Sequence, residues 1–461
     1  MKISHVKTDD AMNIIIVGCG KVGRTLAEQL NEEDNNVTVV DLSPAKVNSA
    51  TGRSDLMGVV GNGATHAVQK AAGIDTADLL IAVTGSDELN LLCCVTAKKA
   101  GCQAIARIKN PDYYKEAPYL KDELGLAMVT NPEQAAAAEI ARVLRFPSAI
   151  QIETFARGRV ELLKFRLPPE SRLVGLSVKD VVGKLHCDVL ICTVERGDEA
   201  LIAGADLVFE QNDVVSLVAS PKSAGDFFRL IGINTRAVKS VLIAGGGDIT
   251  HYLSEMILRF GMSVKVIEQD PKKCQLLSRE LPEVTVIEGD ATEKDLLLEE
   301  GIATTDAFVA LTNLDEENIL LSLYAKSQGT KKQVTKINRI DFDDVIRRLD
   351  LDSIVCPKNV TADAIVRYVR AMKRSIGSKV EALYNVIQDK VEASEFTVTE
   401  PSRITGVPLS QLKFKENVLV ASLLRNGTVL IPRGNDTIEP GDSVIIVSKI
   451  MGLSDITDVL R

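Results

Sequence analysis

The chain has 461 residues, of which 45% are hydrophobic and 25% charged, with 54 Lys and Arg against 63 Asp and Glu. This length allows about three domains at ~150 residues each, and the composition is typical of soluble globular domains and not of disordered chains. The net charge of −9, the 4% aromatic content and the absence of Trp disfavour a general nucleic-acid-binding surface.

The chain begins with a short polar segment, so the sequence predicts no secretory signal. No uninterrupted apolar run approaches the ~20 residues that span a bilayer. The eight cysteines include no C-x-x-C pair and lie mostly in apolar stretches, which indicates buried thiols in a reducing, cytoplasmic compartment. No histidine is spaced as a ligand with another metal-binding residue, so we expect no metal site.

An internal repeat decides the organisation of the chain. The segment Asn13–Gly23 returns as Ser240–Thr250, and Gly18 and Gly245 are 227 positions apart. Three further landmarks keep nearly the same offset: Asp41 with Glu268, Gly63–Thr65 with Asp290–Thr292, and Thr84–Asn90 with Thr312–Asn318. We therefore predict a tandem duplication with a unit of about 230 residues.

Each unit opens with alternating strand and helix patterns. In the first unit the predicted strands are Asn13–Val17, Val37–Asp41, Met57–Val60, Leu79–Val83, Ala104–Ile108 and Ala127–Val129. Helical patterns such as 22–31 and 88–100 lie between them, and an Ala-rich helix at 132–145 closes this part, with a counterpart at 357–374. Continuous apolar strands alternating with helices predict an α/β fold, a Rossmann-type, doubly wound parallel sheet.

The remainder of each unit is β-rich. Apolar runs flank a polar turn at 195–199 and again at 425–428, which predicts a hairpin in each unit. Matching turns at 210–213 and 439–442 lead into a last apolar strand. The predicted domains are therefore Rossmann-type at 12–146 and 238–374, each followed by a small α+β domain, at 147–233 and 375–461.

A glycine fingerprint opens the first unit. Gly18, Gly20 and Gly23 follow an apolar strand and begin a helix, which is the context that a dinucleotide-binding loop requires. Gly18 allows the tight turn, Gly20 lets the backbone approach a pyrophosphate, and Gly23 lets the helix pack against the strand. Asp41, at the end of the second strand, can accept both ribose hydroxyls and would repel a 2′-phosphate. The pattern predicts NAD(H) or an adenine nucleotide and disfavours NADP.

The second unit departs from this fingerprint at one position. Gly245 and Gly247 are present and Glu268 supplies the carboxylate, but Thr250 stands where the third glycine would be. Two interpretations remain open here, a second nucleotide site or a degenerate site retained for its fold.

Other polar residues follow the strands of the first sheet, at the edge where open α/β sheets bind ligands. Asn62–Thr65 follows the third strand, Thr84–Asp87 follows the fourth, and Arg107 ends the fifth. Structural roles explain these residues equally well: an Asx turn at Asn62, a helix N-cap at Ser86 or Asp87, and a surface ion pair at Arg107.

These duplicated motifs resemble the RCK (KTN) family, whose domains regulate K⁺ conductance. The resemblance rests on the two glycine loops, the turns at 61–65 and 289–292, and the Thr-x-x-Asp-Glu segments at 84–90 and 312–318. It covers nearly the whole chain after the first eleven or so residues. It implies a regulator without catalytic residues that binds NAD(H) or ATP/ADP in its Rossmann domains. The implied protein is a homotetramer on the cytoplasmic face of the membrane, beneath a separate integral-membrane K⁺-uptake subunit.

The resemblance also implies which residues contact the nucleotide. In the first unit these are Gly18, Cys19, Gly20, Lys21, Val22, Gly23, Asp41, Asn62, Gly63, Ala64, Thr65, Thr84, Gly85 and Arg107. In the second unit they are Gly245, Gly246, Gly247, Asp248, Ile249, Glu268, Asp290, Ala291, Thr292, Thr312, Asn313 and Lys336. Asp87–Asn90 and Asp315–Asn318 are candidates to relay the nucleotide state, or ordinary acidic helix starts that complement the helix dipole.

Two other functions remain open. The chain could be an RCK regulator of a different transporter, such as a K⁺/H⁺ antiporter. It could also be an NAD-dependent oxidoreductase, which would need an acid–base pair beside the nicotinamide. His66, His186 and His251 have no predicted partner for that role, which disfavours catalysis.

Overall fold

The computed structural model describes residues 11–52, 56–146, 149–156, 159–169, 171–185, 188–232, 238–338, 346, 348–349, 351–372, 378–387, 390–453 and 455–461. The chain divides into two compact units. One unit takes in Met1–Ala136 and Cys356–Arg374, and the other takes in Ala137–Val355 and Ser375–Arg461. His5, His186 and Cys187 lie outside the described residues.

The first unit is built on a six-stranded parallel sheet in the order β3-β2-β1-β4-β5-β6. The strands are β1 (Asn13–Val17), β2 (Asn36–Asp41), β3 (Met57–Val60), β4 (Leu79–Ala82), β5 (Gln103–Arg107) and β6 (Met128–Thr130). The helices are α1 (Lys21–Glu32), α2 (Pro44–Thr51), α3 (His66–Ala71), α4 (Asp87–Lys99), α5 (Pro111–Lys115), α6 (Ala117–Leu124) and the start of α7 (Pro132–Arg145). The predicted doubly wound sheet is confirmed.

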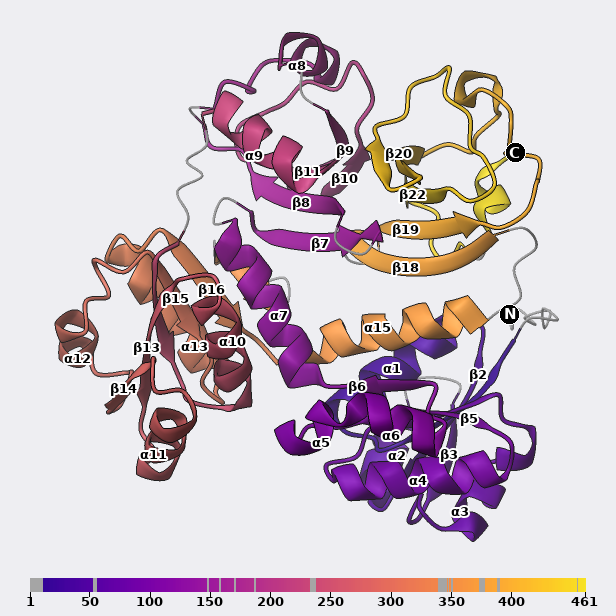
Figure 1. Cartoon of the computed structure of the whole chain (residues 1–461), viewed down its shortest axis with the longest axis vertical. Coiled ribbons are helices and arrows are strands. Elements are labelled where there is room, and N and C mark those ends of the chain that lie inside the picture. Colours follow the sequence, from indigo (N-terminus) through magenta and orange to yellow (C-terminus); the bar gives the residue numbers. More distant parts are fainter. Residues whose placement is uncertain are drawn as a thin grey trace. The chain divides into compact units, whose positions relative to one another are not determined.

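The helix that ends the Rossmann part of the second repeat completes this first unit. Helix α15 (Pro357–Met372) packs beside α1 (Figure 1). The Nε atom of Arg370 donates to Glu33 at 3.0 Å, and the Tyr368 hydroxyl lies 3.0 Å from the side-chain oxygen of Gln103. The compact units therefore do not follow the linear order of the predicted domains, whose boundaries stay a prediction.

The second unit contains the repeated Rossmann sheet, in the order β14-β13-β12-β15-β16-β17 and again parallel. The strands are β12 (Ser240–Ala244), β13 (Ser263–Glu268), β14 (Thr285–Glu288), β15 (Ala307–Ala310), β16 (Lys332–Lys336) and β17 (Ser353–Val355). The helices include α10 (Asp248–Leu258), α11 (Pro271–Glu280), α12 (Lys294–Glu299) and α13 (Asp315–Ser327).

The second unit also holds both β-rich domains, each with a five-stranded antiparallel sheet. The first sheet consists of β7 (Gln151–Phe155), β8 (Val160–Arg166), β9 (Val189–Arg196), β10 (Glu199–Ile202) and β11 (Val214–Ala219), with helices α8 (Val178–Leu185) and α9 (Pro221–Leu230). The second sheet consists of β18 (Ser378–Ile387), β19 (Val391–Val398), β20 (Val418–Arg425), β21 (Thr428–Leu430) and β22 (Ser443–Ser448). Both predicted hairpins, β9–β10 and β20–β21, are confirmed.

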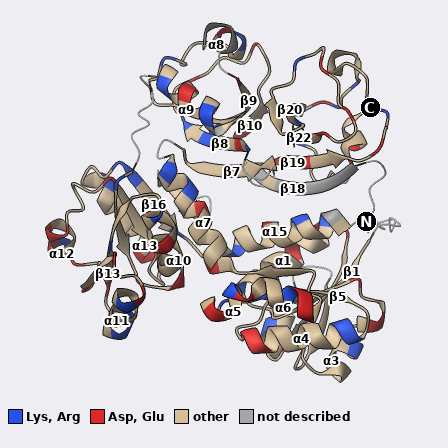
Figure 2. Ribbon diagram, in the orientation of Figure 1, with Lys and Arg blue, Asp and Glu red and all other residues tan. Residues whose placement is uncertain are grey.

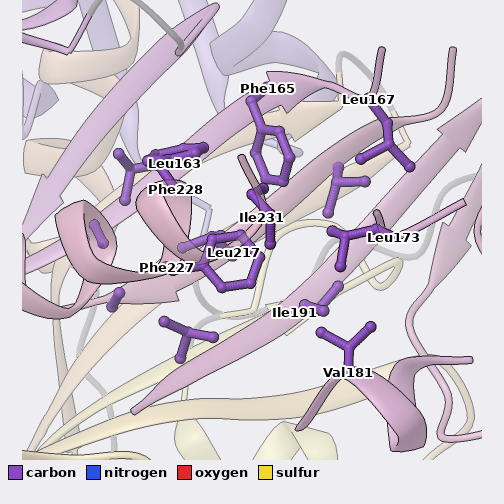
Figure 3. Packing of buried hydrophobic residues seen from close by; sticks show 14 of the residues in the cluster. Leu163, Phe165, Leu167, Leu173, Val181, Ile191, Leu217, Phe227, Phe228 and Ile231 are labelled. Carbon is purple, nitrogen blue, oxygen red and sulfur yellow. The ribbon is translucent and has the colours of Figure 1, made fainter. Parts of the chain in front are cut away.

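Each β-rich domain has its own apolar core. In the first domain Phe227 and Phe228 of α9 pack edge-on against Phe165 of β8 (Figure 3). A third cluster joins the two domains, because buried side chains such as Phe155 and Ala393 belong to one continuous core. Buried apolar area of this kind is the main source of stability for such small sheets.

The turns that match between the β-rich domains have the same side-chain clamp. Asp213 accepts two hydrogen bonds from Arg196, at 2.9 and 2.8 Å, and Asp442 accepts two from Arg425, at 2.8 and 2.6 Å. Both aspartates are buried, and each holds the guanidinium against the strand end in a bidentate pair. The repeat seen in the sequence therefore extends to individual side-chain contacts.

Candidate nucleotide-binding sites

The first glycine loop connects β1 to α1, where the strand order of the sheet reverses. Gly18 has φ of +108°, a backbone conformation that side chains rarely adopt, and its N–H donates to the Val40 carbonyl at 2.7 Å. A Cβ atom at Gly23 would overlap the carbonyl oxygen of Gly18. Both positions therefore require glycine for the turn and for the approach of α1 to the loop.

The middle glycine leaves room at the start of the helix. Gly20 is the N-cap of α1, no side chain caps the helix, and a Cβ atom at this position would meet nothing within 4 Å. The first N–H groups of a helix need acceptors from outside the helix, and they favour an anion. The loop therefore combines open space with unsatisfied donors, as a phosphate site requires.

Asp41 ends β2 and holds the glycine loop. Its carboxylate accepts from the backbone N–H of Cys19 at 2.8 Å and from that of Ser43 at 2.9 Å. Burial, together with the nearby Asp41 carboxylate, raises the pKa of the Cys19 thiol to about 11, so this thiol is neutral at physiological pH. Asp41 thus has a structural role that the sequence analysis did not assign, and each oxygen retains lone-pair capacity for a ribose hydroxyl.

Asn90 of α4 ties together the loops that follow β4 and β5. Its side-chain oxygen accepts from the Thr84 backbone N–H at 2.8 Å and from the Thr84 hydroxyl at 2.7 Å. Its amide nitrogen donates to the Arg107 carbonyl at 2.9 Å. Asn90 is fully buried, so a residue of α4 sets the position of two predicted nucleotide contacts.

The start of α4 is fixed in a similar way. Asp87 accepts from the backbone N–H groups of Lys109 and Asn110 at 2.9 and 2.7 Å. Ser86 caps the helix through Leu89 N, and Figure 2 shows α4 acidic at its start and basic at its end. The N-cap expected for this segment is thus present, and Asp87 additionally anchors the segment that follows β5.

Arg107 pairs with the first turn of α7. One terminal guanidinium nitrogen lies 2.9 Å from Glu133 Oε1, and both side chains are 18% exposed. The pair is incomplete, because Arg107 Nε and Glu133 Oε2 are buried without a hydrogen-bond partner among the described residues. The ion pair proposed as an alternative for Arg107 exists, and it leaves one donor and one acceptor for a further group.

The Asn62–Thr65 turn is an Asx turn. The side-chain oxygen of Asn62 accepts from the Ala64 N–H at 3.0 Å, and the Thr65 hydroxyl donates to the Asn62 carbonyl at 2.9 Å. The alternative structural role predicted for Asn62 is therefore present at this strand end. The other predicted contacts of the first unit lie in the same loops or at the start of α1, namely Lys21, Val22, Gly63 and Gly85.

The second glycine loop repeats the first with one change. Gly245 has φ of +101°, and Gly247 is the uncapped N-cap of α10 with nothing within 4 Å of an added Cβ. Thr250 is fully buried, and its hydroxyl donates to the Gly245 carbonyl. At Gly23 the helix lies too close to the Gly18 carbonyl for any side chain. At Thr250 the threonine side chain fits and bonds the corresponding carbonyl of Gly245.

The carboxylate of the second loop is buried. Glu268 accepts from the Gly246 N–H at 2.6 Å and from the Asp270 N–H at 2.8 Å, and is 7% exposed. These contacts match those of Asp41. Ala291 and Ile249 are also buried, whereas Asp248 is exposed at the start of α10.

The remaining loops of the second unit also follow the first. Asn318 Oδ1 accepts from the Thr312 N–H at 2.8 Å, and its Nδ2 donates to the Lys336 carbonyl at 3.0 Å. Asp290 accepts from Thr292 N and Oγ1, and these bonds lower the pKa of its carboxyl. Asn313 lies in the turn before α13. The residues predicted for the second site thus lie at the carboxyl ends of strands β12 to β16, in the loops that follow them, or at the start of α10.

Comparison with known proteins settles the family. The TrkA-N domain model matches residues 14–132 and 241–357, and the TrkA-C domain model matches residues 162–232 and 393–461. The chain belongs to the TrkA family. It is 33% identical to "Trk system potassium uptake protein TrkA homolog 1" of Methanosarcina mazei, over 96% of this chain and 99% of that protein. It is 30% identical to "Trk system potassium uptake protein TrkA" of Haemophilus influenzae, over 94% and 95% of the two chains.

Solved structures support the fold of this TrkA-family chain. A crystal structure of the GsuK RCK domain superposes with a TM-score of 0.63 at 17% identity, covering 96% of this chain and 94% of that one. The GsuK channel bound to NAD gives a TM-score of 0.62 at 16% identity, covering 96% and 78%. The predicted RCK architecture, a Rossmann domain and a β-rich domain present twice, is confirmed.

Sequence reasoning missed two features of these TrkA-type sites. Glu133 was not among the predicted site residues, although it binds Arg107. The joining of two loops by Asn90 and Asn318 was also missed, although both lie six residues after the corresponding threonine, and that shared spacing was the available signal.

No helix in the described part of the chain is long and apolar enough to cross a membrane. The described residues also contain no cluster of three or more His, Cys, Asp and Glu side chains placed to hold a metal ion.

Proposed function

We propose that the chain is a nucleotide-sensing regulatory subunit that gates a separate, Trk-type K⁺-uptake protein in the membrane. One observation carries the proposal: a glycine loop with an open N-cap and a strand-end carboxylate occurs twice. It occurs within a chain whose relatives, matched over nearly their full length, are named Trk potassium uptake proteins.

The proposed ligands are NAD(H) and ATP or ADP. A phosphate at Gly20 or Gly247 would meet the free N–H groups of a helix start. Asp41 and Glu268 would accept ribose hydroxyls, and either carboxylate would repel the 2′-phosphate of NADP. The GsuK channel, a structural neighbour, has been solved with NAD and with ADP, which supports this ligand class for the fold.

The nucleotide signal would leave the first site through α7. Arg107 at the end of β5 binds Glu133 in the first turn of α7, and this helix continues from the first compact unit into the second. A nucleotide phosphate near Arg107 would compete with Glu133 for the guanidinium. Bound nucleotide would then favour one arrangement of α7 over another, which is a population shift set by differential affinity.

We also propose where the subunit lies and how it is assembled. It lies on the cytoplasmic face of the membrane, assembled as a homotetramer beneath its membrane partner, and has no catalytic role. His251 Nε2 lies 3.1 Å from Glu280, and His66 is exposed on α3. Steady turnover of NADH with a 2-hydroxy or amino acid would contradict the non-catalytic part of this proposal.

K⁺ flux tests the function directly. The membrane subunit that co-purifies with the chain is reconstituted in vesicles, and Rb⁺ uptake is measured with and without the chain and each nucleotide. We expect the chain to change uptake, and nucleotide to change it further, but only when the glycine loops are intact. The Gly20→Asp/Gly247→Asp variant places carboxylates in the open phosphate space and serves as the control. Rb⁺ uptake that does not depend on the chain would contradict the proposal. Co-purification of a K⁺/H⁺ antiporter would instead favour the alternative function, regulation of that transporter.

A further inference from the structure

The two glycine loops have similar backbone conformations but differ in the charged side chains around them. Four positions correspond between the repeats, either by the 227-residue offset or by strand register: Lys21 with Asp248, Arg24 with His251, Asp41 with Glu268, and Arg107 with Lys336. The first site therefore has three cations and one carboxylate at these positions. The second site has one cation and two carboxylates, with a histidine in place of an arginine.

Two of the three cations of the first site, Lys21 and Arg24, are not paired within the described residues, whereas Arg107 is paired with Glu133 through one terminal nitrogen. Among the described residues, neither the Lys21 ammonium nor the Arg24 guanidinium has a hydrogen-bond or ion-pair partner. Lys21 is exposed at the first position of α1, directly after Gly20. Arg24 Nε and Arg107 Nε are buried donors without an acceptor. An anion with several phosphates would supply the acceptors that these groups lack.

The second site presents a different surface. Asp248 takes the place of Lys21, exposed at the first position of α10. The histidine and the lysine at the matched positions both have partners within the protein, because His251 Nε2 lies 3.1 Å from Glu280 and Lys336 Nζ donates to the Leu311 carbonyl at 3.2 Å. An added phosphate would thus meet a carboxylate at the helix start and no free cation at these matched positions.

We propose that the two sites select different nucleotides. The first site prefers a nucleoside triphosphate, and the second prefers a dinucleotide, whose phosphate charge is limited to a pyrophosphate. Lys21 and Asp248 are the residues that set this preference. A triphosphate carries more negative charge than a pyrophosphate diester, so one charge of either sign near the helix start changes its affinity more than that of the dinucleotide. This inference rests on the proposed function, since it assigns ligands to the same two sites.

A reciprocal charge exchange tests the inference in the full-length chain. Each site is measured alone, the first in a Gly247→Asp background and the second in a Gly20→Asp background. Both glycines have ordinary negative φ values and open space around an added Cβ, so these blocking substitutions do not strain the fold. ATP and NADH are titrated by calorimetry at low salt with EDTA, because magnesium would mask the triphosphate charge.

The parent sites should differ by about tenfold or more in their ATP-to-NADH affinity ratio. Lys21→Asp should lower ATP affinity at the first site about tenfold, and Asp248→Lys should raise it about tenfold at the second, with NADH affinity changing less than about threefold. Lys21→Met and Asp248→Asn should give about half of each effect on a logarithmic scale. High salt should shrink all of these differences, because the exposed charges at both positions are screened.

Loss of nucleotide selectivity and loss of nucleotide binding have different consequences. Equal ATP-to-NADH ratios at the two parent sites, or charge exchanges that leave the ratios unchanged while nucleotides still bind, would overturn the inference alone. A parent chain that binds neither nucleotide at either site would overturn the proposed function, and the inference with it.

Discussion

At the scale of single residues, the two repeats differ in how the start of the helix packs against the glycine loop. Gly23 lets the start of α1 approach the Gly18 carbonyl so closely that no side chain fits, whereas Thr250 fills that place in the second repeat and bonds the Gly245 carbonyl. The second glycine loop therefore keeps the same turn with its helix start supported by a hydroxyl. An irregular fingerprint in the sequence corresponds here to a regular loop in the structure.

This difference predicts the effect of adding one methyl group. Gly23→Ala should lower the free energy of unfolding by about 2–4 kcal/mol, because the new Cβ would overlap the backbone of Gly18. Gly20→Ala is the matched control and should change stability by less than about 1 kcal/mol, since its Cβ meets open space at a φ of −75°. Urea unfolding of the two variants measures this. Equal stabilities would contradict the account of the first loop.

The buried asparagines give a second prediction at this scale. Asn90→Leu should cost about 2–4 kcal/mol, because the Thr84 N–H and the Arg107 carbonyl lose their partner. Asn318→Leu should have a similar effect on the second unit. Thermal unfolding gives the stabilities, and amide hydrogen exchange at Thr84 and Thr312 gives a local readout. Unchanged protection of these amides would show that the asparagines do not hold the loops.

At the scale of secondary-structure elements, the strands of the first sheet could be predicted nearly to the residue. β1 and β3 match the predicted ranges, and β2 begins one residue earlier. Parallel strands buried on both faces have continuous apolar runs bounded by polar turns, and this pattern is local in sequence. The packing of α15 against α1 could not be predicted, because the apolar face of an amphipathic helix does not identify the sheet that it covers.

The placement of α15 predicts a strong effect from a residue far along the chain. The side chains of Arg370 and Glu33 are 5% and 16% exposed, and they form an ion pair within the first unit. Arg370→Met should destabilise that unit by about 3 kcal/mol or more, because Glu33 would keep a buried charge without this partner. Adding Glu33→Gln should recover part of the loss. Urea unfolding of the single and double variants tests this, and additive losses would argue against a direct pair.

A buried lysine in β16 predicts a dependence on pH. Lys332 is fully buried and donates to Ser353 Oγ at 2.9 Å and to Asp352 Oδ1 at 3.1 Å. Burial lowers the pKa of Lys332 below its ordinary value of 10.5, although Asp352 opposes the shift. The folded chain therefore binds this proton less tightly than the unfolded chain does. Between the lowered pKa and 10.5, stability due to Lys332 rises with pH, by up to about 1.4 kcal/mol per pH unit.

Comparison with Lys332→Met isolates this effect from the other titrating groups. The free energy of unfolding of the parent, minus that of the variant, should increase as the pH rises toward 10.5. Guanidinium unfolding at a series of alkaline pH values gives this difference. A difference that stays flat or decreases would contradict the assignment of a destabilised ammonium to Lys332.

At the scale of the whole molecule, the repeat in the sequence predicts the domain plan but not the side-chain contacts between the loops. Motifs at a constant offset predicted two Rossmann domains and two β-rich domains, and family and fold comparisons agree with that plan. Contacts such as Arg107 with Glu133 could not be foreseen, because they join residues 26 positions apart through the fold and not through a motif. The sites could thus be located from their loops, whereas the side chains that connect those loops to the rest of the molecule are brought together only by the three-dimensional fold.

Nucleotide titration of the purified chain tests whether the two glycine loops bind nucleotide. NADH, NAD⁺, ATP and ADP are titrated by calorimetry into the parent and into the Gly20→Asp/Gly247→Asp variant, whose circular dichroism and melting temperature are first shown to match the parent. We expect sub-millimolar binding of at least one of these nucleotides to the parent and none to the variant, because carboxylates would occupy both phosphate positions. A parent that binds none of them, or a variant that binds as tightly as the parent, would contradict this expectation.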